Sequence, residues 1–364
     1  MVEWKNIGEV CKVHTGSQLN KADMLENGPY PVVNGGKEYS GYTDKYNENA
    51  YTITISQGGE SAGYVNWLEV CFWAGAHCYV VENPEGYNTR YLYHTLKNKE
   101  REIQLSKQGA GIPGLNRDTL YKQVIPIPSL EEQARIVGIL DTFTSAIDNL
   151  KEQIAQRRKQ YEYYRDQLLN LEGKPGVEMK TIKDICSNIC SGGTPSTSHK
   201  EYYEGSVNWL RTQEVDWKEI FDTEIRITEE AIANSSAKLI PENCIIVAMY
   251  GATAAKVAIN KIPLTTNQAC CNLEIDNGKA LYKFVFHWLC KEYLNLKAMG
   301  EGSQNNINSQ KVKGYPIPLP PLNEQQRIVS ILDTFEASIQ NLEAQLKQRE
   351  KQYEYYRNKL LTFE

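Results

Sequence analysis

Apolar residues recur with a seven-residue period through a long segment in the middle of the chain. Two series of positions carry this period: Ile136, Phe143, Leu150, Tyr164 and Leu171, and Leu140, Ile147, Ile154, Tyr161 and Leu168. Arg157 interrupts the first series. Apolar residues at two positions of consecutive heptads predict a long coiled-coil helix.

The same pattern returns at the end of the chain. Its two series are Ile328, Phe335, Leu342, Tyr356 and Phe363, and Leu332, Ile339, Leu346, Tyr353 and Leu360, and Arg349 interrupts the first. At a fixed offset of 192, residues 126–172 and 318–364 share 29 identities in 47 positions without a gap. An ungapped match of this length indicates one structural unit used twice. About 40 helical residues at 1.5 Å each predict two rods of roughly 60 Å.

Sequence signals also predict where the two helices begin and end. Ser129 and Glu132 have the spacing of a capping box, whereas the second copy has Pro321 in place of the serine and keeps only Glu324. Residues 173–176 end the first helix with two glycines and a proline. Each apolar stripe needs a partner, and the chain must leave one domain and return from another, so we expect the helices to pair antiparallel. The alternative is two ordinary amphipathic bundle helices.

The remaining residues form two domains of related sequence. We expect domains at 1–125 and 177–317, each followed by a helical segment, at 126–172 and 318–364. The expected class is α/β (α+β), with a pseudo-two-fold repeat. The expected strands are Tyr51–Ser56, Cys78–Glu82, Cys244–Met249 and Ala269–Ile275, and the expected helices are Thr89–Leu105 and Ala280–Met299.

Composition narrows the class of protein. Forty Lys and Arg against 45 Asp and Glu give a net charge of −5, without a basic block, which argues against a simple nucleic-acid binder. If DNA is the ligand, local basic patches or a partner protein must neutralise its phosphates. Nine cysteines without paired metal spacing favour reduced thiols, and the lack of a membrane-length apolar run or secretory signal favours the cytoplasm.

Residue patterns of catalysis are missing from the sequence. The five histidines have no spacing typical of a metal centre or a triad, and Cys186 and Cys190 lack a second pair to complete a zinc site. The GxGxxG match at Gly109–Gly114 follows a polar helical stretch instead of a strand, which favours a surface loop over a dinucleotide site. We therefore expect no catalytic residue, no metal ligand and no cofactor in this chain.

Polar, glycine-rich loops carry side chains suited to base edges. Asn and Gln can pair with adenine, Arg with guanine, and Glu can accept from cytosine. The candidates are Thr15, Ser17, Asn34, Ser56, Gln57, Lys107 and Gln108 in the first domain, and Thr194, Ser196, Arg211, Gln213, Glu214, Tyr250, Lys256, Asn267, Gln268, Gln304 and Asn305 in the second. The same residue types also fill ordinary turns.

These motifs resemble the specificity subunit of type I restriction–modification enzymes over essentially the full chain. The resemblance rests on PIPSLEEQARIVGILD and PIPLPPLNEQQRIVSILD, Gly192–Ser196, TTNQAC at Thr265–Cys270 and QNNINSQKV at Gln304–Val312. It is weaker in the first domain, where Thr15–Ser17 replaces the Gly-Gly-Thr-Pro-Ser run.

The resemblance implies two target-recognition domains that read the halves of a bipartite double-stranded DNA target, with the helices setting the spacer. It implies no cofactor in this chain, two methyltransferase subunits that use S-adenosylmethionine, and motor–nuclease restriction subunits. Candidate partner contacts are Tyr163, Tyr355, Arg135 and Arg327. The alternatives are a stand-alone DNA methyltransferase or nuclease, and a coiled-coil adaptor that does not read DNA.

Overall fold

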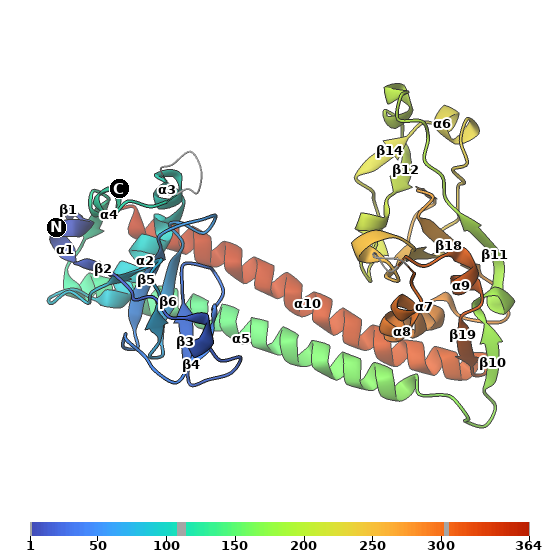
Figure 1. Ribbon diagram of the computed structural model, residues 1–364, viewed down its shortest axis with the longest axis horizontal. Helices are drawn as coiled ribbons and strands as arrows, with labels where there is room; N and C mark the ends of the chain where they lie inside the picture. The colour runs from blue at the N-terminus through green and yellow to red at the C-terminus, as the bar shows by residue number, and fades with distance from the viewer. Residues whose placement is uncertain (1, 108–113, 302–305, 364) are drawn as a thin grey trace. The chain divides into compact units, whose positions relative to one another are not determined.

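The chain folds into two compact units, each of which combines one domain with parts of both long helices. The computed structural model describes residues 2–107, 114–301 and 306–363. Unit 1 comprises residues 1–153 and 342–364, and unit 2 comprises residues 154–341. The long helices are α5 (Leu130–Leu168) and α10 (Leu322–Leu361), drawn in green and in orange-red in Figure 1.

Helix α5 begins four residues later than the repeat from which it was predicted. Residues 126 and 127 belong to strand β9 (Val124–Ile127), which pairs antiparallel with β1 (Glu3–Asn6). The Ser129 hydroxyl accepts a hydrogen bond from the Glu132 backbone N–H at 3.3 Å, as in a capping box. The Glu132 carboxylate instead binds Arg135, at 2.6 Å, so only half of the expected box forms.

Besides the β1–β9 pair, unit 1 contains two small sheets and several short helices. The strands of the first sheet, in spatial order, are β2 (Val13–Thr15), β8 (Cys78–Val81), β5 (Thr52–Ser56) and β6 (Val65–Leu68). The second sheet has the order β4 (Gly41–Thr43), β3 (Tyr30–Val33) and β7 (Trp73–Ala74). The helices are α1 (Ile7–Val10), α2 (Thr89–Asn98), α3 (Glu100–Leu105), α4 (Arg117–Tyr121) and the 3₁₀ turn Lys21–Asp23.

Unit 2 repeats this plan with one added strand. Its first sheet has the order β11 (Cys186–Ser191), β18 (Cys270–Ile275), β15 (Ile245–Ala248), β16 (Val257–Asn260) and the addition β13 (Glu219–Ile220). Its second has the order β14 (Ile225–Ile227), β12 (Val207–Leu210) and β17 (Thr265–Thr266), and β10 (Glu178–Thr181) pairs with β19 (Pro316–Leu319). The helices are α6 (Glu229–Ala233), α7 (Tyr282–Lys291), α8 (Tyr293–Ala298) and α9 (Ser309–Lys313), and the 3₁₀ turns are Ile182–Ile185, Lys200–Tyr203, Thr212–Glu214 and Gly251–Thr253.

The repeat extends to the backbone conformation. Tyr51 and Asn243, which are 192 residues apart, both have a positive φ, of 61° and 64°. Such a φ is uncommon for residues other than glycine. The shared conformation therefore supports a common origin of the two domains. It agrees with the mixed α/β repeat that was expected from the sequence.

The two helices run antiparallel, as the connectivity of the chain predicted. The core of unit 1 includes Ile136 and Leu140 from the start of α5 together with Leu361 from the end of α10. The core of unit 2 includes Ile328 from the start of α10 and Leu169 from the residue after α5. In each unit, the beginning of one helix thus lies beside the end of the other (Figure 1).

Stacked aromatic pairs join the helices between these cores. Phe143 stacks on Tyr356 in unit 1, with ring centroids 5.2 Å apart, and Tyr164 stacks on Phe335 in unit 2 at 5.3 Å. The arginines that interrupt the heptads lie over the same phenylalanines: Arg157 over Phe335 at 5.9 Å and Arg349 over Phe143 at 5.8 Å. Cation–π contact explains why a charged residue occupies an apolar position in both copies.

Two helices predicted as continuous are broken at equivalent places. Lys99 separates α2 from α3, and Glu292 separates α7 from α8, with ψ angles of 2° and 8° that leave the helical region. The break lets each short second helix turn away and bury Ile103 or Leu296. Across the residues that the structure describes, every helix is too short or too polar to cross a bilayer.

Candidate nucleic-acid interface

The candidate residues of the first domain gather around the loop that precedes β8. The Gln57 backbone N–H donates to the His77 carbonyl at 3.0 Å, and the His77 N–H donates to Asn34 Oδ1 at 3.4 Å. The Ser17 N–H donates to the carbonyl of Ala74, the last residue of β7 before this loop, at 2.8 Å. Four loops that are distant in sequence therefore meet at one end of the sheets.

Arg117 completes this cluster, although the sequence did not single it out. Its guanidinium donates a hydrogen bond to Thr15 Oγ1 at 3.0 Å and lies over the Tyr79 ring at 5.7 Å. The side chain is exposed and borders an open hollow of about 610 Å³ that Gln57 and Asn116 also line. Its position follows the Leu115-Asn116 match to Ile307-Asn308, which is the signal that could have found it.

The second domain builds its cluster from equivalent loops. The Thr194 hydroxyl donates to the Gln268 side chain, and the Gly193 N–H donates to the Thr266 carbonyl at 2.9 Å. The Asn267 N–H donates to the Leu210 carbonyl at 2.9 Å, which places the loop beside Arg211 at the end of β12. The turns Thr212–Glu214 and Gly251–Thr253 are in contact and bring Gln213, Glu214 and Tyr250 to the same region.

Glycine is required where the first loop of each cluster crosses a neighbouring strand. A Cβ on Gly16 would collide with the Ala74 carbonyl, and a Cβ on Gly192 would collide with the Thr266 carbonyl. Ala74 and Thr266 are equivalent residues at the offset of 192. The same close backbone approach therefore positions the loop in both domains.

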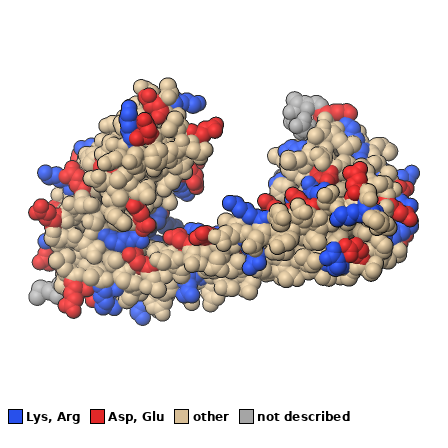
Figure 2. All heavy atoms as spheres, turned by 90° about the horizontal axis from the view of Figure 1, so that it is seen from below, with Lys and Arg blue, Asp and Glu red and all other residues tan. Residues whose placement is uncertain are grey.

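The cations of the second cluster are already paired with carboxylates. Lys256 binds Asp216 at 2.7 Å and lies over the Trp217 ring at 4.2 Å. Arg211 binds Glu224 and lies 3.9 Å from Glu214. Figure 2 shows positive and negative side chains intermingled over the face that it displays. Phosphates approaching these loops would have to compete with carboxylates for Arg211 and Lys256.

Several of the candidate base-contacting residues are buried or make contacts outside the two loop clusters. Ser56 is only 5% exposed, because it ends strand β5 with its side chain turned inward. Lys107 lies beyond α3, where its ammonium donates to the Glu60 carbonyl at 3.3 Å, and Ser196 is exposed and shares a hydrogen bond with Ser198. The candidates Gln108, Gln304 and Asn305 lie outside the described residues.

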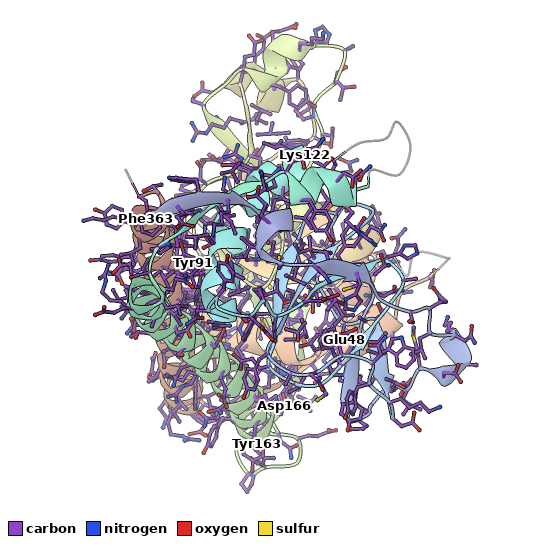
Figure 3. The ribbon with its side chains drawn as sticks, turned by 90° about the vertical axis from the view of Figure 1, so that its left-hand side faces the viewer. Glu48, Tyr91, Lys122, Tyr163, Asp166 and Phe363 are labelled. Atoms are coloured by element: carbon purple, nitrogen blue, oxygen red, sulfur yellow. The ribbon has the colours of Figure 1, made fainter. Side chains whose placement is uncertain are left out.

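The candidate partner-binding residues are exposed on the long helices. Tyr163 is 61% exposed and Tyr355 59%, and each ring packs edge-on against the following tyrosine. Figure 3 labels Tyr163 with its exposed neighbour Asp166 on α5. Arg135 and Arg327 also occupy equivalent places, and each is held by the carboxylate three residues before it.

A buried histidine joins each domain to both helices. In unit 1, His94 on α2 lies 2.7 Å from Asp141 of α5 through Nε2 and 3.3 Å from the Tyr353 hydroxyl of α10 through Nδ1. Arg90 adds a bond to Asp141 at 2.8 Å. Burial lowers the pKa of His94 more than the bond to Asp141 raises it. Burial at this three-helix contact thus favours the neutral form of the imidazole.

Unit 2 has the same junction with one more carboxylate. His287 on α7 contacts the Tyr161 hydroxyl through Nδ1 at 3.1 Å, and its Nε2 faces Asp333 at 3.5 Å. Glu336 occupies the place of Thr144 of unit 1, and burial raises its pKa. Donor atoms of His287, Asp333 and Glu336 all lie within 4.8 Å of one another. The sequence did not reveal this group because its members come from separate elements.

Buried glutamines from the repeated motif fix the start of each long helix. The side-chain oxygen Oε1 of Gln133 accepts a hydrogen bond from the Asn88 backbone N–H at 2.9 Å. The Oε1 atom of Gln325 likewise accepts from the Leu281 backbone N–H at 2.9 Å. Asn88 and Leu281 precede α2 and α7. The side chain of this glutamine thus joins the beginnings of two helices, which gives the glutamine of the motif a structural role.

Every cysteine of the chain lies among the described residues and is a free thiol. Burial raises the pKa of Cys11, Cys78, Cys186 and Cys244 to about 12. Cys11, Cys78 and Cys244 are buried core side chains, and Cys186 is partly buried against the core of unit 2. Raised pKa values make such thiols poor nucleophiles at neutral pH.

Comparison with known proteins relates this architecture to one family. The chain matches the family described as "Type I restriction modification DNA specificity domain" over residues 1–157 and again over 175–350. It is 33% identical over 392 residues to the type I restriction enzyme EcoR124I/EcoR124II specificity subunit of Escherichia coli, covering 100% of this chain and 94% of that protein. A putative type I restriction enzyme specificity subunit of Haemophilus influenzae is 28% identical, with coverages of 100% and 96%.

Solved structures agree at the level of the fold. The crystal structure of the S subunit of a type I restriction–modification system from M. genitalium superposes with a TM-score of 0.69 at 19% identity, covering 100% of this chain and 97% of that one. A chain from a study of type I complex assembly and conformational transition gives 0.59 at 16% identity, with coverages of 99% and 97%. Both halves of the chain match one family and a relative matches over the full length, so this protein belongs to the family of type I restriction–modification DNA specificity subunits.

Proposed function

We propose that this chain reads a bipartite double-stranded DNA target, with one half-site for each domain. The observation that carries the proposal is the pair of loop clusters. Equivalent loops meet at the same end of equivalent sheets, held by the same backbone contacts at Gly16 and Gly192. The side chains that they present differ, with Asn34, Gln57 and Arg117 in one and Asn267 and Gln268 in the other. Two domains that recognise different DNA sequences need this combination of a shared backbone scaffold and different side chains in the loops.

The antiparallel helices are proposed to set the spacer between the half-sites and to dock two methyltransferase subunits. Tyr163 and Tyr355 support the docking, because they offer two equivalent exposed aromatic surfaces. The acidic chain fits a subunit that leaves part of the phosphate neutralisation to its partners.

In this proposal the chain itself is not catalytic. S-adenosylmethionine belongs to the methyltransferase subunits, which also extrude the target adenine, and restriction subunits join the same complex. Such a complex works on cytoplasmic DNA. The isolated chain should therefore transfer no methyl group to DNA when it is supplied with S-adenosylmethionine.

The proposal is tested with paired variants in the complex of this chain with its methyltransferase subunits. Methylated sites in the host DNA are mapped by sequencing for the wild type, for Asn267→Ala with Gln268→Ala, and for Asn34→Ala with Gln57→Ala. Each pair should relax or change one half-site and leave the other intact. A change in both half-sites from either pair, or in neither from both, would reject the assignment of one reader to each domain.

A further inference from the structure

The junction of unit 2 contains two buried polar atoms that face each other without a hydrogen bond. His287 is 0% exposed, and its Nε2 has no partner among the described residues; neither has Asp333 Oδ1. The two atoms are 3.5 Å apart. In unit 1 the equivalent atoms of His94 and Asp141 are 2.7 Å apart and hydrogen-bonded. The same junction is thus closed in one unit and wider in the other.

Tyr161 decides which nitrogen of His287 is available. Its hydroxyl donates to Glu336 Oε1 at 3.2 Å and lies 3.1 Å from His287 Nδ1. With the hydroxyl proton given to the carboxylate, the Tyr161 oxygen accepts from Nδ1, which corresponds to the tautomer with the ring proton on Nδ1. In that tautomer the Nε2 lone pair faces a carboxylate oxygen, and a cation between these two acceptors would stabilise them.

A metal ion fits this separation better than a proton. Zinc binds imidazole nitrogen and carboxylate oxygen at 2.0–2.2 Å, so two ligands of a tetrahedral ion are about 3.4 Å apart. The separation of 3.5 Å between His287 Nε2 and Asp333 Oδ1 has this size. One donor atom each from His287, Asp333 and Glu336 lies within 4.8 Å of the others, and Glu336 stands where unit 1 has Thr144.

We propose that His287, Asp333 and Glu336 bind one divalent transition-metal ion of the zinc type at the junction of the second domain with helix α10. The surroundings provide the supporting contacts that such sites need. Lys283 binds the other oxygen of Asp333 at 2.8 Å, and Tyr161 orients the imidazole. All three ligands also line a cavity of about 470 Å³, which gives an ion a path inward and leaves room for a water ligand.

The bound ion would fasten α7 to α10 and so hold the second domain to its helix. Unit 1 achieves the same attachment with the direct bond from His94 to Asp141. The site therefore makes the stability of one half of the molecule depend on metal supply. This role is independent of whether the loop clusters read DNA.

The test is metal titration of the full chain after treatment with a chelator. Co²⁺ should bind with a stoichiometry of one and give the visible ligand-field bands of a four- or five-coordinate ion, and Zn²⁺ should displace it. Glu336→Thr, which copies unit 1, should weaken binding at least tenfold, and His287→Gln should abolish it. Asp141→Asn is the matched control in unit 1 and should leave binding unchanged.

Three results would overturn the proposal: wild-type binding no tighter than that of His287→Gln, equal binding by Glu336→Thr, or charge-transfer bands of cobalt bound to thiolates. The circular dichroism spectrum of each variant shows whether it is folded. Glu336→Thr decides the question if His287→Gln does not fold, because threonine occupies the equivalent place in unit 1. In addition, the chelator should lower the melting temperature of the wild type more than that of Glu336→Thr.

Discussion

Lengthening both long helices by one heptad should lengthen the spacer of the DNA target and leave its half-sites unchanged. The insertions belong in residues 150–161 of α5 and in residues 338–349 of α10, because the pairs Phe143–Tyr356 and Tyr164–Phe335 place these stretches opposite each other. Seven helical residues add about 10.5 Å at 1.5 Å each. At 3.4 Å per base pair this is up to about 3 base pairs, if the helices run along the DNA. Seven residues also restore the helical phase to within about 20°, so the domains keep nearly their original facing.

The assay is methylation mapping in a host that carries the lengthened subunit with its methyltransferase partners. The expected result is two unchanged half-sites separated by a longer unread spacer. A matched control inserts the heptad into α5 alone, which shifts one stacked pair out of register while the other stays, and should abolish methylation. An active double insertion with the original spacer would refute the idea that the helices set the distance.

Three further predictions follow from the junctions and the exposed helix surface. Gln325→Leu removes the acceptor of the Leu281 N–H and should lower the free energy of unfolding by about 1–3 kcal/mol in urea denaturation. Gln133→Leu should have the same effect at the equivalent contact. An unchanged midpoint in both variants would contradict the structural role of the motif. Burial lowers the pKa of His94 in the folded state, so its contribution to stability should be complete above the unfolded pKa of about 6.5 and lost as the pH falls through the folded pKa. His94→Gln should therefore flatten the dependence of the melting temperature on pH below about 6.5. A steeper dependence would show that the sign is wrong. Tyr163→Ser and Tyr355→Ser should each weaken the binding of a methyltransferase subunit about tenfold in calorimetric titration without lowering the melting temperature, and unchanged affinity in both variants would place the docking surface elsewhere.

The sequence predicted the long helices well because their contacts are periodic. Heptads indicate a continuous apolar stripe, and the connectivity of the chain favoured an antiparallel partner to cover it. The start of α5 was less predictable. Residues 126 and 127 were assigned to the helical segment 126–172, yet they form part of strand β9 because β1, at the other end of the domain, pairs with them. Such a pairing leaves no local signal.

The loops of the candidate interface were found by composition, since Gly, Asn and Gln cluster there. Side-chain direction was not accessible in the same way. Ser56 looked suitable for base contact, but the register of β5 turns it inward, and register depends on partners across the sheet. The group of His287, Asp333 and Glu336 was hidden for a related reason, because α7 and α10 bring it together only in the folded chain.

The placement of the chain ends has an evolutionary consequence. The core of unit 1 includes Ile7 near the N-terminus and Leu361 near the C-terminus, with Phe363 packed against it (Figure 3). Unit 2 has the same arrangement without a break, as the chain runs from Leu169 through residues 173–176 into Ile182. A linker from the end of α10 to β1, with new ends cut within residues 173–176, should therefore keep the two cores. A circularly permuted gene for this subunit is expected to encode a chain that folds into the same two units, which circular dichroism would check.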